Sequence, residues 1–129
     1  VYCLVSALVF HELTVENHRR MQLALPRPAH KPKVDIMPVE YFHLSEQPYL
    51  AGIEEHEVEG TTVKVYSPAK TVADLFRYRR TVGDALAIEG LRQALRQSRA
   101  TPAEIACEAE AAGVWATMEP YVMALTSDA

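Results

Sequence analysis

The strongest constraint on the fold is a change of pattern at Ser67-Pro68, about halfway along the 129-residue chain. Before this point, residues 54–59 and 61–66 alternate in strand-like fashion on either side of Glu59-Gly60, and Gly60 allows the positive φ of a tight turn. After it, Ser67 can cap a helix and Pro68 fits the first helical position. We therefore expect a β-hairpin that runs directly into a helix.

Helical periodicity continues from this junction almost to the end of the chain. Val72, Leu75 and Phe76 lie at three- and four-residue spacing, which is typical of one buried helix face. Further helices are expected at residues 85–97, from the capping box Thr101-Pro102-Ala103-Glu104 to Gly113, and at residues 114–125, where Pro120 should bend or split the helix.

The first half of the chain predicts one short helix and several strands. Leu4 and Leu8 have helical spacing, residues 21–25 form an apolar run that stops at the proline-rich segment 26–33, and residues 39–43 alternate. The prediction is one α+β domain over residues 1–129, with a short N-terminal helix. Its small, mostly antiparallel sheet is expected over residues 20–66, and its helical half over residues 67–126.

The ends and the cysteines bear on the setting of the chain. It starts at Val1 without an initiator Met, so we expect that an upstream segment precedes it. The apolar stretch of residues 1–10 has no basic leader and is too short to span a bilayer, which predicts no membrane role. Cys3 and Cys107 are expected to be two buried free thiols of a cytoplasmic protein.

The residues that could carry catalysis are few. The acidic run Glu54-Glu55-His56-Glu57-Val58-Glu59 can be interpreted either as a cation-binding strand face or as a solvated hairpin edge, and we favour the edge. A nuclease-like site would use Glu55, Glu57 and Lys64, but Thr62 stands where its motif requires an acid. There is no metal-ligand grouping, phosphate loop or nucleophile elbow. We expect no enzyme, no metal and no cofactor.

Charge is arranged in blocks along the chain although the net charge is −4. Arg92, Arg96 and Arg99 are spaced to form one stripe on a helix, which could follow the phosphates of a nucleic acid or line an acidic protein surface. The residues predicted to bind DNA or a partner protein are Arg19, Arg20, Arg27, Lys31, Lys33, Arg77, Arg79, Arg80, Arg92, Arg96 and Arg99.

The segment from Val65 to Arg79, VYSPAKTVADLFRYR, resembles the C-terminal region of the AbiEi antitoxins, regulators that are paired with AbiEii nucleotidyltransferase toxins. Residues 1–8 before His11-Glu12-Leu13 look like the family's first helix after its DNA-binding domain. Residues 23–27 look like its early strand, and residues 94–102 like its later helices. The most specific part of the resemblance comprises Ser67, Pro68, Lys70, Thr71 and Asp74, to which we assign a structural role at the junction.

The resemblance implies a function in type IV toxin-antitoxin systems and phage defence. In such proteins an N-terminal winged helix binds operator DNA, and the C-terminal region counters the toxin, directly or indirectly, and supports transcriptional regulation. No winged helix lies within this chain, so the basic surfaces are the expected contacts with toxin or operator. Two alternatives stay open: the nuclease-like domain, and a domain of a transcription regulator that binds a small ligand or dimerises.

Overall fold

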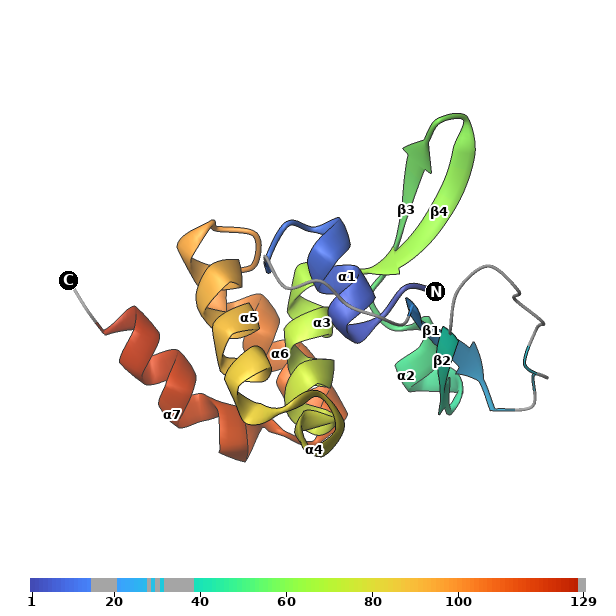
Figure 1. The fold of residues 1–129 in the computed structure, drawn as a ribbon. Coiled ribbons are helices and arrows are strands. Elements are labelled where there is room, and N and C mark those ends of the chain that lie inside the picture. The colour runs from blue at the N-terminus through green and yellow to red at the C-terminus, as the bar shows by residue number, and fades with distance from the viewer. Residues whose placement is uncertain (15–20, 28, 30, 32–38, 128–129) are drawn as a thin grey trace.

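A computed structural model describes residues 1–14, 21–27, 29, 31 and 39–127 (Figure 1). The helices and strands follow one another in the order α1 (Leu4–Phe10), β1 (Met21–Pro26), β2 (Val39–Leu44), α2 (Glu46–Leu50), β3 (Ile53–Val58), β4 (Thr61–Tyr66), α3 (Pro68–Arg77), α4 (Arg79–Val82), α5 (Asp84–Arg96), α6 (Pro102–Ala112) and α7 (Trp115–Thr126). The α+β class and the helical C-terminal half are therefore confirmed.

In the residues that the structure describes, two pairs of strands make up the β-structure, and one of the two is antiparallel. β3 pairs with β4 in antiparallel register, with Ile53 opposite Tyr66, whereas β1 pairs with β2 in parallel. A parallel pair needs a connection long enough to return the chain to the same end, and residues 27–38 supply it. Tyr2 joins the pairs by bridging Leu23 of β1 and Val65 of β4.

The β3–β4 hairpin has the predicted turn and projects from the body of the molecule (Figure 1). Glu59 and Gly60 both have positive φ, 51° and 80°, as a two-residue type I′ turn requires. Gly60 adopts this conformation without steric cost, whereas Glu59 does so under mild strain. The turn fixes the register that carries the chain from β4 into α3.

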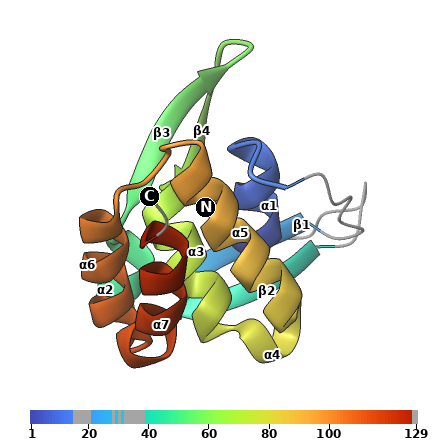
Figure 2. The same ribbon diagram turned by 90° about the vertical axis from the view of Figure 1, so that its left-hand side faces the viewer.

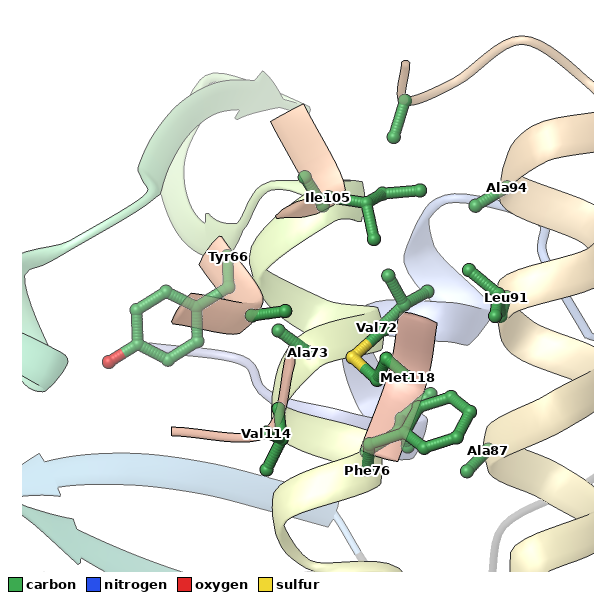
Figure 3. Close-up of a cluster of buried hydrophobic side chains, with 14 of the residues drawn as sticks. Tyr66, Val72, Ala73, Phe76, Ala87, Leu91, Ala94, Ile105, Val114 and Met118 are labelled. Carbon is green, nitrogen blue, oxygen red and sulfur yellow. The ribbon is translucent and has the colours of Figure 1, made fainter. Parts of the chain in front are cut away.

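α3 is the central element of the core. Every residue from Pro68 to Phe76 is buried, and α3 lies among α1, α5, α6 and α7 (Figure 2). Figure 3 shows Val72 and Phe76 of α3 meeting Leu91 of α5 and Met118 of α7. The amphipathic pattern after Ser67 thus belongs to a helix that is covered on nearly all sides.

The ends of the later helices also follow the sequence signals. Thr101 and Glu104 form the predicted capping box, with Thr101 N donating to Glu104 Oε1 at 2.8 Å and Glu104 N to Thr101 Oγ1 at 3.1 Å. α6 stops at Gly113, which has a φ of 75°. α7 is not split at Pro120, because the carbonyl of Ala116 that loses its amide partner lies on an exposed part of the helix.

Residues 46–50 form the short helix α2 between β2 and β3, and α1 ends at Phe10. One expectation about the cysteines is wrong. Cys3 is buried as expected, but Cys107 is exposed, because it lies on the outer side of α6; both are free thiols. Among the described residues, no helix is long and apolar enough to cross a membrane.

Candidate functional site

The junction after β4 holds an ion pair inside the core. Lys70 Nζ donates to Asp74 Oδ1 at 3.2 Å, and both side chains are only 3% exposed. The ammonium also lies 5.1 Å from the centre of the Tyr66 ring. The sequence placed this i,i+4 pair on one helix face, but it gave no sign that the face would be buried.

Neighbouring backbone geometry holds Lys70 in place. Ser67 Oγ accepts from Lys70 N at 3.2 Å, which is the predicted helix cap. A Cβ on Gly52, whose φ is +75°, would lie 2.7 Å from Lys70 Cβ, so only glycine fits beside this side chain. Thr71 Oγ1 donates to Tyr66 O at 3.3 Å and ties the strand end to α3. These contacts support the structural role assigned to the segment.

Burial controls the ionisation of this cluster. It raises the pKa of Asp74 above the usual range of a carboxyl, and the Lys70 ammonium only partly offsets the shift. Burial also raises the pKa values of the Tyr66 hydroxyl and the Cys3 thiol, and the Asp74 carboxylate raises both further. Tyr66 and Cys3 therefore stay neutral near pH 7, and Cys3 is a poor nucleophile.

A second polar cluster forms around His11, which the sequence did not single out. The imidazole is 2% exposed, and its Nε2 lies 2.8 Å from Tyr66 O. A carbonyl only accepts, so Nε2 carries the proton and Nδ1 is free to accept from Arg99 Nη2 at 3.5 Å. Burial lowers the pKa of His11; Arg99 lowers it further, while Glu54 and the Tyr66 carbonyl oppose the shift.

Arg99 does not continue the arginine stripe predicted on α5. The helix ends at Arg96, Ser98 takes a φ of 54°, and the chain then turns so that Arg99 Nη1 donates to His11 O at 3.0 Å. The i+7 spacing would have aligned Arg99 with Arg92 only if the helix had continued for another turn. Arg99 instead ties the end of α5 to the end of α1.

Arg92 and Arg96 remain together at a groove of about 710 Å³. α5, α7 and the beginning of α6 contribute its lining, which comprises Arg92, Leu95, Arg96, Ser98, Ala100, Thr101, Pro102, Leu125 and Thr126. Arg92 Nη1 pairs with Glu89 Oε2 at 3.3 Å. Arg96 is exposed, and within the described residues its side chain makes no hydrogen bond or ion pair. We call this feature the arginine groove.

The arginines after α3 are largely engaged in local contacts. Arg79 donates to Phe76 O at 3.1 Å and lies 3.8 Å from Asp84 Oδ1. Arg77 is exposed and lies 5.6 Å from the centre of the Tyr78 ring. Arg80 is exposed. Some of the basic residues at the end of α3 therefore stabilise the end of that helix, as expected for cations at a helix C-terminus.

The structure describes only some of the basic residues predicted in the first half of the chain. Arg27 and Lys31 are exposed, and Arg27 N donates to Leu44 O at 3.0 Å. Arg19, Arg20 and Lys33 lie outside the described residues. The structure thus brings together Arg92 and Arg96, and it does not show one continuous surface that contains all eleven predicted residues.

The acidic hairpin has the geometry of a solvated edge. Glu54 and His56 share one face of β3, where His56 Nε2 lies 2.9 Å from Glu54 Oε1. Glu55 and Glu57 are exposed. Glu55 lies opposite Lys64 in the hairpin, so two of the three residues of the nuclease-like alternative are side by side. Both of these residues are exposed. Within the described part of the chain, no group of three or more acidic, His or Cys side chains could hold a metal ion.

A separate cleft of about 430 Å³ lies between α2, α3 and α6. No pattern in the sequence indicated this cleft, because its walls come from three elements far apart in the chain. Its lining residues are Gln47, Pro48, Leu50, Ala51, Lys70, Arg77, Glu108, Ala111 and Ala112. We call it the α2–α3–α6 cleft.

Comparison with known proteins adds no identification. No known protein family matches the chain, and no curated protein is similar to it at a significant level.

Proposed function

We propose that this chain is a non-enzymatic binding domain of an antitoxin-type regulator, which acts in a type IV toxin-antitoxin system. Two observations support the proposal: the resemblance of residues 65–79 to the AbiEi antitoxins, and the exposed arginine groove. The groove carries the greater weight, because Arg96, which pairs with none of the described residues, lies beside Arg92 on a concave surface. A negatively charged partner surface, either operator phosphates or a patch on the toxin, would neutralise it.

The groove is suited to an extended anionic partner. Arg96 lies in the last turn of α5, and Thr101 and Pro102 at the start of α6 line the same groove, where the N-terminal end of a helix favours negative charge. Glu104 opposes this effect locally because its carboxylate occupies the cap. Arg92 and Arg96 are therefore the residues on which binding should depend most, and Arg99, which is held by His11, should matter less.

The first test measures binding of the chain to generic duplex DNA at several salt concentrations. The affinity should fall steeply as salt rises, and Arg96→Gln should lower it and flatten the salt dependence by about one counterion. Lys64→Gln is the matched control, since it removes one exposed charge from the hairpin. Equal losses for Arg96→Gln and Lys64→Gln would argue against the arginine groove.

The second test asks whether the partner is a toxin. The chain is co-expressed with a nucleotidyltransferase toxin encoded beside it, and growth is measured for wild type, Arg92→Glu/Arg96→Glu and Lys64→Glu. The antitoxin role is supported if the wild-type chain and Lys64→Glu restore growth and Arg92→Glu/Arg96→Glu does not. The absence of rescue by the wild-type chain, together with no affinity for DNA, would exclude the proposal.

A further inference from the structure

The α2–α3–α6 cleft has the size of a small-molecule site. Its volume of about 430 Å³ falls within the usual range of ligand pockets. It shares no lining residue with the arginine groove. Any ligand of this cleft would therefore be distinct from the anionic partner proposed above.

Two of the elements that line the cleft carry opposite charges. Arg77 belongs to α3 and Glu108 to α6, and both line it. In the part of the chain that the structure describes, neither is in an ion pair with the other or with a third residue. Among the described residues that line the cleft, Arg77 and Glu108 are therefore the charged side chains without an ion-pair partner, and the Arg77 guanidinium lies 5.6 Å from the centre of the Tyr78 ring.

The other charges of the cleft cancel one another. Lys70 lines the cleft, but its ammonium is paired with Asp74 at 3.2 Å. The formal charges of Lys70, Asp74, Arg77 and Glu108 add up to zero. Once Lys70 and Asp74 are paired, Arg77 and Glu108 remain without an ion-pair partner among the described residues. A purely anionic ligand would be repelled by Glu108, and a purely cationic one by Arg77. A zwitterion fits the charges best.

The rest of the lining is mainly apolar, with Gln47 as its polar member. Leu50 is 58% exposed at the edge of the cleft, and Ala111 and Ala112 face it from α6. Covering such surface would stabilise a complex by about 25 cal/mol for each Å² removed from water. A ligand with an aliphatic group beside its charged centre would use both kinds of wall.

We propose that the α2–α3–α6 cleft binds a free aliphatic amino acid. The carboxylate meets the Arg77 guanidinium, which can donate two parallel hydrogen bonds to it. The ammonium meets the Glu108 carboxylate, and the side chain lies against Leu50 and Ala111. The buried pair Lys70–Asp74 forms a fixed floor, since Gly52 and the Tyr66 ring hold Lys70 in place.

The experiment titrates the ¹⁵N-labelled full chain with L-leucine and follows amide shifts by NMR. We expect saturable shifts at Leu50, Arg77 and Glu108 and their neighbours. Arg77→Gln and Glu108→Gln should each weaken binding at least about tenfold, as expected for loss of a charged hydrogen bond. The matched controls are Arg80→Gln and Glu110→Gln, which remove exposed charges close by that do not line the cleft; these should bind as wild type does.

Three analogues test the zwitterion. 4-Methylpentanoate lacks the ammonium, 3-methylbutylamine lacks the carboxylate, and N-acetyl-leucinamide has neither charge. Each should bind at least about tenfold more weakly than L-leucine. Equal binding of any analogue, equal losses in the control variants, or no saturable shift in a well-folded wild-type chain would overturn the proposal. None of these outcomes depends on DNA or toxin binding, so the two proposals fail separately.

Discussion

At the residue scale, the buried ion pair and the buried imidazole are the most informative positions. Lys70 and Asp74 satisfy each other inside the core, and His11 is held between Tyr66 O and Arg99. In both cases a polar group sits where an apolar one would be cheaper to bury, and its partners fix the geometry. Substitution of one partner should therefore cost far more than substitution of both.

Asp74→Ala should destabilise the fold by about 3–5 kcal/mol, because it leaves the Lys70 ammonium buried without its counterion. The double variant Lys70→Met/Asp74→Leu should recover most of that loss, since it removes both charges and keeps their volume. Urea unfolding at pH 7 measures both free energies of unfolding. A double variant as unstable as Asp74→Ala would show that packing, and not the unpaired charge, dominates at this site.

His11 should make the stability depend on pH below neutrality. Its pKa is lowered in the folded state by burial and by Arg99. The neutral imidazole is therefore favoured, and its contribution is complete above the unfolded pKa of about 6.5 and is lost as the pH falls below that value. Urea unfolding at about pH 7.5 and about pH 5.5 should show a loss in wild type that is smaller in His11→Gln.

His56→Gln is the control for this effect: the His56 imidazole is 40% exposed and lies on the hairpin, and of the groups that lower the pKa of His11 it has the smallest effect. It should leave the difference between the two pH values close to that of wild type. The His11 assignment would fail if His56→Gln abolished the difference and His11→Gln did not. In His11→Gln, the glutamine side chain still has an Nε–H donor for Tyr66 O, so this hydrogen bond has a replacement.

At the scale of the elements, the capping box of α6 provides a local test. Thr101 and Glu104 satisfy each other's amides at the helix start. Thr101→Ala should lower the free energy of unfolding by about 1 kcal/mol, because an amide of the first turn loses its acceptor. Glu104→Gln should be nearly neutral at pH 7, since glutamine can also complete the box. A larger loss for Glu104→Gln than for Thr101→Ala, measured by urea unfolding, would contradict this account.

The elements that the sequence predicted well are those specified by local chemistry. The Glu59-Gly60 turn, the Ser67-Pro68 helix start and the Thr101 capping box each depend on residues within a few positions of one another. The parallel pairing of β1 with β2 and the turn that directs Arg99 to His11 depend on contacts between distant parts of the chain. Periodicity does not report such contacts, so the arginine stripe was predicted one residue too long.

The same limit applied to the candidate sites. Arg92 and Arg96 were identifiable because they lie on one helix, whereas the α2–α3–α6 cleft needs three elements to come together. Arg77 was predicted to bind DNA or a partner protein, and that stays a prediction; its place in one cleft with Glu108 follows only from the packing of α3 against α6.

At the scale of the whole molecule, α3 connects the sheet half to the helical half. It follows β4 directly, and its buried residues pack in one cluster with Leu8 of α1, Leu44 of β2 and Leu91 of α5. Tyr2 joins the two strand pairs, and Arg99 joins the ends of α1 and α5. With one shared core, the two halves should not unfold separately.

Unfolding should therefore be a single cooperative transition that probes in either half report alike. Trp115, the only tryptophan, lies in α7 and reports on the helical half through its fluorescence. Leu44→Ala removes a buried side chain from β2, and a loss of about 2–5 kcal/mol is expected. That loss should lower the urea midpoint by the same amount in Trp115 fluorescence and in the amide NMR signals of β1 and β2. A Trp115 transition that stays at the wild-type midpoint while the amide signals of the strands shift would show that the helical half folds without the sheet. Joint movement of both signals would show that the residues 1–66 and the helices share one folding unit, so that mutations in the strands can disturb the arginine groove without touching it.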